Sequence, residues 1–224
     1  MERQSLLYRD EHLIAVNKPS GLATHRGWAP ERDTALTRAR DMLGQRVHLP
    51  HRLDRGTSGA LLFALDEQTH RALAASFEAQ QVHKRYLALV RGHAPASGTI
   101  DHAIRDKGQA EGRPAISDYQ LLGHSPVERC SLLQVEPRTG RPHQIRRHLK
   151  HISHPLLGDT RYGKGALNRH YREHHGLHRL ALHAVTLTFA HPHSGEPVTV
   201  HAPLPEDFAE VLDRLGLMAP DLQL

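Results

Sequence analysis

A short apolar run, Gly59–Leu65 (GALLFAL), most constrains how this chain folds. The run is apolar on both faces, so a strand formed by it has no side that suits water. Such a strand lies in the centre of a sheet and is covered by further layers. The segment just before it, Thr57-Ser58, is typical of a turn that leads into the strand. We therefore expect a layered protein built around this strand.

Other segments show the spacing of strands and helices. Strands are predicted at 12–16, 84–92, 130–136, 182–189 and 197–201. Helices are predicted after caps at Asp33-Thr34 and Asp66, near 141–152 with Pro142 at an early position, and near 208–215, where Gly216 ends the helix. Residues 93–128 are expected to be an insertion or a small hairpin, and 155–177 to be irregular. Because strands and helices do not strictly alternate, we predict an α+β fold with a mixed, mostly antiparallel central sheet and flanking helices.

The charge balance favours a polyanionic partner. The 224 residues contain 29 Lys and Arg against 24 Asp and Glu, which gives a net charge of +5 and a pI near 9.6. This excess of basic groups makes nucleic acid the first candidate partner, although many basic proteins bind none.

Cysteine content and hydropathy indicate a cytoplasmic protein. The single cysteine, Cys130, excludes an internal disulfide and suits a reducing compartment. It lies in a predicted strand, so we expect a buried, inert thiol. The charged first residues lack the core of a signal peptide, and no apolar run approaches the roughly 18 residues of a membrane helix. A soluble cytoplasmic protein is therefore expected.

One carboxylate, Asp54, stands among basic residues in HRLDRGTSG (His51–Gly59). The guanidinium groups of Arg52 and Arg55 favour its ionised form. An ionised carboxylate can act as a nucleophile, a base or an electrostatic stabiliser of a developing cation, but it is poorly suited to act as an acid. The alternative is an Asp–Arg pair that only ties down a loop. The spacing alone leaves both interpretations open.

A second basic cluster, Arg138–Lys150, lies mostly within the predicted helix near 141–152. Its apolar stripe is Ile145, Leu149 and Ile152, and the basic residues lie mostly off that stripe. Such a row can bind phosphates, and the alternative is a solvated helix face. The cluster comprises Arg138, Arg141, His143, Arg146, Arg147, His148 and Lys150.

Histidines also raise the possibility of a metal site. His170, Glu173 and His174 form H-x-x-E-H, the inverted zincin pattern, which would make the protein a zinc hydrolase. That pattern needs a firm helix and a downstream acidic ligand, whereas the next acidic residue is Glu196. We therefore expect no catalytic metal. Because neither G-x-G-x-x-G nor a P-loop is present, no nucleotide cofactor is expected either.

Four motifs in order resemble the RluA family of pseudouridine synthases. They are NKPSGLATH (Asn17–His25), HRLDRGTSG, KRYLALVRG (Lys84–Gly92) and TGRPHQIRRHL (Thr139–Leu149), and HPLLGDTRYG follows at 154–163. Together the motifs cover nearly the whole chain. The resemblance implies a mixed sheet with flanking helices, a long basic RNA-binding cleft and no cofactor.

The resemblance also implies roles for individual residues. Asp54 would be the catalytic aspartate and Arg146 its partner, while Tyr86 would stack on the flipped uracil. Arg52 would enter the RNA and hold the target nucleotide out, and Ile145 would line the base pocket. The remaining RNA-binding residues expected are Arg55, His143, Arg147 and Lys150.

The same likeness bears on substrate and organisation. RRHLKHISHPLLGD and HHGLHRLALHA resemble the branch that modifies tRNA at the uridine conventionally numbered 65. A ribosomal RNA uridine, or non-catalytic RNA binding, is the alternative. Pro142 replaces the Thr of many relatives. Only 16 residues precede Asn17, too few for the S4 RNA-binding domain of some relatives, so we expect a single catalytic domain over 1–224 that itself recognises the substrate. We also expect a monomer.

Overall fold

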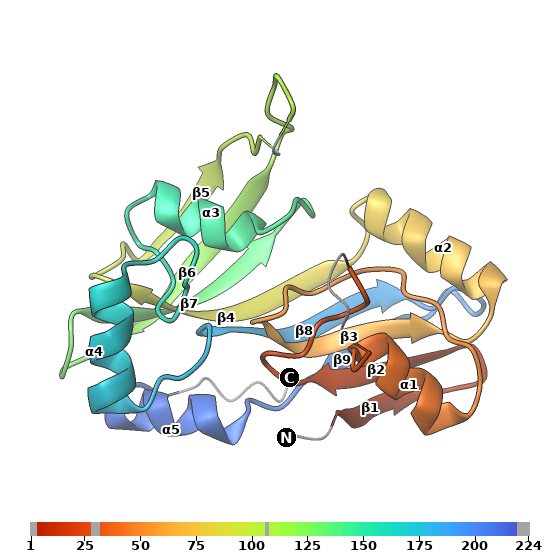
Figure 1. Ribbon diagram of the computed structural model, residues 1–224. Coiled ribbons are helices and arrows are strands. Elements are labelled where there is room, and N and C mark those ends of the chain that lie inside the picture. Colours follow the sequence, from red (N-terminus) through yellow and green to blue (C-terminus); the bar gives the residue numbers. More distant parts are fainter. Residues whose placement is uncertain (1–3, 28–31, 106–107, 219–224) are drawn as a thin grey trace. The chain divides into compact units, whose positions relative to one another are not determined.

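The fold is taken from a computed structural model that describes residues 4–27, 32–105 and 108–218. These residues form nine strands and five helices, so the predicted α+β class is confirmed (Figure 1). In chain order they are β1 (Ser5–Arg9), β2 (Leu13–Lys18), α1 (Ala35–Leu43), β3 (Ser58–Ala64), α2 (Glu67–Glu78), β4 (His83–Arg91), β5 (Ser97–Asp101), β6 (Ile116–His124), β7 (Cys130–Pro137), α3 (Gln144–His151), α4 (Gly165–His175), β8 (Leu182–Ala190), β9 (Pro197–His201) and α5 (Glu206–Arg214).

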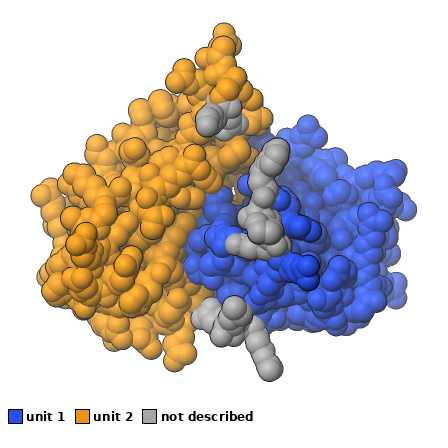
Figure 2. All heavy atoms as spheres, in the orientation of Figure 1, with its two compact units in different colours: residues 1–83, 184–203 blue, residues 84–183, 204–224 orange. Residues whose placement is uncertain are grey.

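The chain divides into two compact units (Figure 2). Unit 1 is Met1–His83 with Ala184–Pro203, and unit 2 is Lys84–His183 with Leu204–Leu224. The division therefore falls at the start of β4 and inside β8.

Unit 1 is built around β3, the strand that the apolar run predicts. All seven residues of β3 are buried. The strand order in this unit is β1-β2-β3-β8, with β9 on β8, and the β1·β2, β2·β3 and β8·β9 pairs are antiparallel. Helix α2 covers the strands with Leu73 and Phe77, which pack into the same cluster as Leu62 and Leu187. One part of the core of unit 1 therefore lies between the sheet and α2, and the opposite face of β3, with Leu61 and Phe63, is also fully buried.

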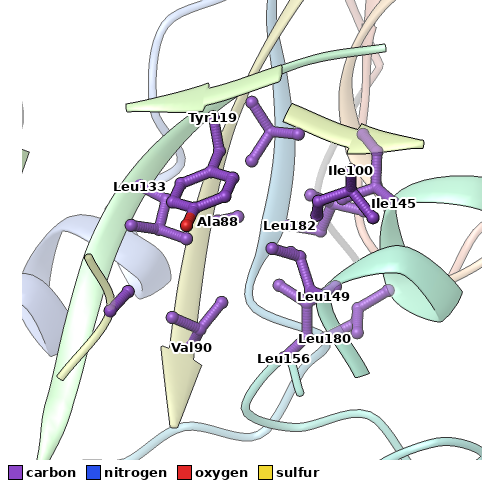
Figure 3. Close-up of a cluster of buried hydrophobic side chains, with 12 residues drawn as sticks. Ala88, Val90, Ile100, Tyr119, Leu133, Ile145, Leu149, Leu156, Leu180 and Leu182 are labelled. Atoms are coloured by element: carbon purple, nitrogen blue, oxygen red, sulfur yellow. The ribbon is translucent and has the colours of Figure 1, made fainter. Parts of the chain in front are cut away.

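Unit 2 contains four antiparallel strands in the order β4-β7-β6-β5. Helix α3 packs on them through Ile145 and Leu149, two members of the predicted apolar stripe. Figure 3 shows both side chains in one buried cluster with Ala88 and Val90 of β4 and Tyr119 of β6. This packing sets which face of α3 carries the basic residues. The β5·β6 pair also confirms a small hairpin within 93–128.

Several helix boundaries follow from the local chemistry that the sequence indicates. The side chain of Thr34 caps α1 in a capping box, and Asp66 caps α2 by accepting from the Thr69 N–H at 2.8 Å. Helix α5 ends before Gly216, which has φ +64°. The expectation that Pro142 lies at an early position of this helix is wrong, because α3 begins two residues later, after His143 takes a left-handed conformation with φ 54°.

The expectation that 155–177 is irregular is wrong for α4. This helix has no side-chain N-cap bond and no acidic residue in its first turn, so the usual start signals are absent. Its buried residues are Asn168, Tyr171 and His175. They have helical spacing, but two of the three are polar, and hydrophobic periodicity therefore does not reveal the helix.

Two further expectations concern burial and membranes. Cys130 is buried in β7 as predicted, and burial raises the pKa of its thiol above the ordinary value. Within residues 4–27, 32–105 and 108–218, no helix is long and apolar enough to cross a membrane.

Candidate active site

Asp54 lies in a short loop, Leu53–Thr57, that leads into β3; we call it the Asp54 loop. The Asp54 side chain is half-buried, whereas Arg52 and Arg55 are exposed. The Thr57 N–H donates to the Asp54 carbonyl at 3.0 Å and closes the turn. Just beyond it, Gly59 has φ +115°, and a Cβ there would lie 2.1 Å from the Ala184 carbonyl oxygen. Only glycine fits this entry to the strand.

The ammonium of a buried lysine, Lys18, holds the Asp54 loop by hydrogen bonds. Lys18 ends β2 and is fully buried, which is rare for lysine. Its ammonium donates to the carbonyls of Pro19 at 3.0 Å, Leu22 at 2.8 Å and Arg55 at 3.2 Å. A lysine ammonium has three hydrogens, so these acceptors match its donor capacity. The ammonium thus ties the turn after β2 to the Asp54 loop.

The rest of the Asn17–His25 motif also holds this loop. The Thr24 hydroxyl donates to the Leu53 carbonyl at 2.6 Å and lies 3.3 Å from the Leu53 N–H. The Ser20 hydroxyl donates to the Gly56 carbonyl at 2.7 Å, and the Gly21 N–H donates to the Arg55 carbonyl at 2.9 Å. Two motifs separated in sequence therefore form one rigid support for the carboxylate of Asp54.

Unit 2 brings Tyr86 and Ile145 into one apolar cluster. Tyr86 lies on β4 and is half-buried, and Ile145 of α3 is buried in the same cluster. Lys84, two residues before Tyr86, lies on the same face of β4 because side chains alternate along a strand. Its ammonium donates to the Thr139 carbonyl at 3.3 Å, and burial lowers its pKa from 10.5 to about 8.

Arg146 of α3 forms a two-point ion pair with Asp159. Its Nε and Nη2 donate to the two carboxylate oxygens at 2.8 and 3.0 Å. The side chains are 11% and 1% exposed. Burial alone would raise the pKa of Asp159, but the hydrogen bonds from Arg146 and from the N–H groups of Tyr162 and Arg161 outweigh it and hold that pKa below its usual value. The carboxylate therefore stays ionised and fixes the guanidinium plane.

The loop that carries Asp159 is held by α4. The Asn168 side chain donates to the Asp159 carbonyl at 2.9 Å and accepts from the Gly158 N–H at 3.1 Å. Gly158 has φ +74°, and a Cβ there would lie 1.8 Å from the Arg179 carbonyl oxygen. Helix α4, which the sequence did not predict, thus positions the partner of Arg146.

Three cations gather around the ring of Tyr162. The guanidinium carbons of Arg146 and Arg161 lie 5.1 and 5.6 Å from the ring centroid, and the Lys150 ammonium lies 5.8 Å from it. The Tyr162 hydroxyl is 3.0 Å from His143 Nδ1. Such a group of cations, ordered by an aromatic ring, is suited to phosphate groups.

Other basic residues of the cluster contact protein groups. Arg147 donates to the Arg105 carbonyl at 2.8 Å and Arg141 to the Pro114 carbonyl at 3.1 Å, so both contact the segment between β5 and β6. His148 is buried between the Ser117 hydroxyl and the His102 carbonyl, each 3.0 Å away. His148 is fully buried, so it acts as a packing residue of α3, and burial lowers its pKa, which favours the neutral imidazole.

The structure distributes the predicted site residues over both units. Asp54, Arg52 and Arg55 belong to unit 1, and the others belong to unit 2: Tyr86, His143, Ile145, Arg146, Arg147 and Lys150. The pairing of Arg146 with Asp54 stays a prediction. The sequence did not predict Lys18, which holds the Asp54 loop, or Asp159 and Tyr162, which contact Arg146. Their only signal was membership in the motifs Asn17–His25 and 154–163.

Solved structures define the class of protein to which this fold belongs. The chain is similar to a human protein described as RNA Pseudouridylate Synthase Domain Containing 4, with 27% identity, a TM-score of 0.79 and coverage of 97% of this chain and 95% of that one. Human RNA Pseudouridylate Synthase Domain Containing 1 matches with 30% identity, a TM-score of 0.75 and coverage of 91% and 84%. The fold is that of the pseudouridine synthases, as the sequence motifs predict.

Sequence relatives define the family. The family model RNA pseudouridylate synthase matches residues 12–151. Relatives named tRNA pseudouridine synthase C are 42% identical in Pasteurella multocida, over 93% of this chain and 94% of the relative, and 38% identical in Yersinia pestis, over 97% and 94%. A Pectobacterium carotovorum relative of that name is 40% identical over 94% of this chain, which spans 62% of its length. This chain belongs to the RNA pseudouridylate synthase family, and the predicted enzyme class, an isomerase acting on RNA, is confirmed.

Proposed function

We propose that this protein converts one uridine of tRNA, the uridine conventionally numbered 65, to pseudouridine. The observation that carries the proposal is the run of relatives named tRNA pseudouridine synthase C, at about 40% identity over most of the chain. We further propose one catalytic domain over 1–224 that acts as a cytoplasmic monomer without a cofactor. The buried, unpaired Cys130 supports a reducing compartment.

Asp54 is the proposed catalytic residue. Pseudouridine formation breaks the N-glycosidic bond, rotates the uracil and rejoins it to the ribose through C5. An ionised carboxylate can begin this by attacking C1′, or by removing the C2′ proton to give a glycal. Both routes require the deprotonated acid in a fixed place. The Lys18 and Thr24 contacts supply that fixed place by holding the Asp54 loop on both sides.

Tyr86, Arg52 and Ile145 are proposed to hold the flipped nucleotide. Extracting a base from its stack costs a few kcal/mol. Stacking on the Tyr86 ring recovers roughly 1–3 kcal/mol of this, and the exposed Arg52 occupies the space that the base leaves. Ile145, in one cluster with Tyr86, provides an apolar wall for the uracil.

The basic residues are proposed to divide between support and RNA binding. The resemblance to the family pairs Arg146 with the catalytic acid, and the ion pair to Asp159 orients that guanidinium. His143, Lys150 and Arg55 are proposed to contact phosphates. Arg147 is also proposed to contact a phosphate, and its hydrogen bond to the Arg105 carbonyl holds its side chain against the segment between β5 and β6.

The substrate assignment is tested with RNA that lacks the modification. The protein is incubated separately with transcripts of tRNA and of ribosomal RNA, and pseudouridine is mapped at nucleotide resolution. We expect one modified position in the tRNA, uridine 65, and none in the ribosomal transcript. Modification confined to ribosomal RNA would overturn the tRNA assignment while keeping the enzyme class. Salt-sensitive RNA binding without any product would overturn the catalytic proposal as a whole.

A further inference from the structure

Two histidines and a glutamate of unit 2 converge outside the residues proposed for catalysis. His170 and His175 come from α4, and Glu128 comes from the connection between β6 and β7. Both Nε2 atoms lie against the same oxygen, Glu128 Oε1, at 2.7 Å from His170 and 3.1 Å from His175. The three ligand atoms all lie within 4.8 Å of one another. We call these residues the Glu128 cluster.

The Glu128 cluster differs from the H-x-x-E-H pattern seen in the sequence. Glu173 is exposed, and His174 Nδ1 lies 3.0 Å from the backbone carbonyl of His170. Helix α4 stacks the His174 ring on the His170 ring, with centroids 4.5 Å apart, but it brings neither Glu173 nor His174 into the group of ligand atoms that lie within 4.8 Å of one another. It places His175, one residue further on, beside His170, and the acidic ligand comes from a different element.

The donor set and its spacing suit a transition metal ion. Imidazole nitrogens with a carboxylate oxygen are the ligands that zinc and its neighbours prefer. Zinc binds such atoms at about 2.0–2.2 Å, so ligand atoms around a tetrahedral ion lie roughly 3.3 Å apart. The observed separations of 2.7 and 3.1 Å are about 0.6 and 0.2 Å shorter than this. Small side-chain rotations would admit an ion.

The surroundings fix the ligands and leave one side open. The His175 side chain is 9% exposed, its ring lies 5.4 Å from the buried Tyr171 ring, and Arg214 donates to the His175 carbonyl at 3.0 Å. In contrast, the His170 side chain is 41% exposed. An ion can therefore enter from the His170 side, and water can fill the position that the protein leaves open.

We propose that Glu128, His170 and His175 bind one divalent transition metal ion of the zinc class. Its role is structural: it fixes the C-terminal end of α4 to the connection between β6 and β7. Because α4 carries Asn168, which holds the loop of Asp159, the ion stabilises the element that positions Arg146. The site is separate from the proposed chemistry and supplies no step in it.

The test is a titration of metal-free, untagged protein with Co²⁺, followed by visible absorption, and then displacement by Zn²⁺. We expect one equivalent of Co²⁺ to give the intense d–d bands of a four- or five-coordinate ion. Glu128→Gln and His175→Gln should each weaken binding about tenfold or more. The matched control is Glu173→Gln, which neutralises an exposed carboxylate of the same helix and should leave binding unchanged.

A second control separates this site from another candidate, because His12, Asp66 and His193 of unit 1 also lie within 4.8 Å of one another. His193→Gln should leave the Co²⁺ spectrum unchanged. Circular dichroism checks that each variant folds, and Zn²⁺ should raise the Tm of the parent but not of Glu128→Gln. No spectrum in the parent, equal loss in Glu173→Gln, or loss in His193→Gln with binding kept in Glu128→Gln would overturn the proposal. None of these readouts depends on pseudouridine formation.

Discussion

Replacing Asp159 with asparagine keeps the size of the side chain and removes its charge. The change leaves the Arg146 guanidinium, 11% exposed, beside a neutral amide. Breaking a buried ion pair by removing one partner costs about 3–5 kcal/mol. Asparagine still offers one oxygen to the N–H groups of Arg161 and Tyr162, so we expect a loss near the lower limit, about 3 kcal/mol.

The matched control is Asp118→Asn, which breaks a pair of similar geometry on the surface of the same unit. Asp118 accepts two hydrogen bonds from Arg138, whose side chain is 59% exposed. Exposed pairs contribute about 0–1 kcal/mol, so this variant should differ little from the parent. Urea denaturation measures both changes in the free energy of unfolding, and single-turnover pseudouridine formation measures the loss of Arg146 orientation. We expect activity to fall about tenfold or more only in Asp159→Asn.

The pH dependence of this pair has a definite sign. Because the folded-state pKa of Asp159 is lowered, its stabilisation is present above the ordinary pKa of about 3.9 and is lost as pH falls through the folded value. The difference in stability between the parent and Asp159→Asn should therefore shrink in acid. Equal stability losses for the Asp118 and Asp159 variants at neutral pH would refute the reasoning.

Three further predictions concern buried ionisable groups. Lys18→Met should lower the free energy of unfolding by about 2 kcal/mol or more, because the Arg55 carbonyl of the Asp54 loop loses its donor. The same variant should lower turnover more than RNA affinity, and equal losses of turnover and of affinity would contradict this. RNA affinity should fall as pH rises through about 8, where Lys84 loses its charge, and Lys84→Met should flatten this profile in fluorescence anisotropy. The free energy of unfolding should fall as pH drops below about 6.5, because the unfolded chain protonates this histidine whereas the lowered pKa keeps buried His148 neutral. His148→Gln should make the free energy of unfolding, measured by urea denaturation, depend less on pH in this range.

The parts of the fold that the sequence predicts are those governed by local rules. The run Gly59–Leu65 predicts a central strand because every residue of β3 is apolar or small, and all of them are buried. Asp66 predicts the start of α2 because its side chain can cap the first turn. Helix α4 was not predicted, because the polar residues Asn168 and His175 occupy buried positions where the helical pattern of hydrophobic residues requires apolar ones.

The candidate site shows the same division. Asp54 is conspicuous in the sequence because a lone acid among bases needs an explanation. Asp159 and Lys18 are not conspicuous, because their roles depend on contacts with residues distant in sequence: Asp159 with Arg146, and Lys18 with the carbonyl of Arg55. A buried lysine is rare, so composition and spacing could not have predicted it.

The most direct test of the central claim measures the C5 hydrogen of the target uridine. Forming the new bond through C5 displaces that hydrogen, so tRNA labelled with tritium at C5 of uridine releases tritium in proportion to product. We expect the parent to release one equivalent per target site. Asp54→Asn should bind the same tRNA with similar affinity and release none. Tritium release by Asp54→Asn at the parental rate would contradict the assignment of Asp54 as the catalytic residue.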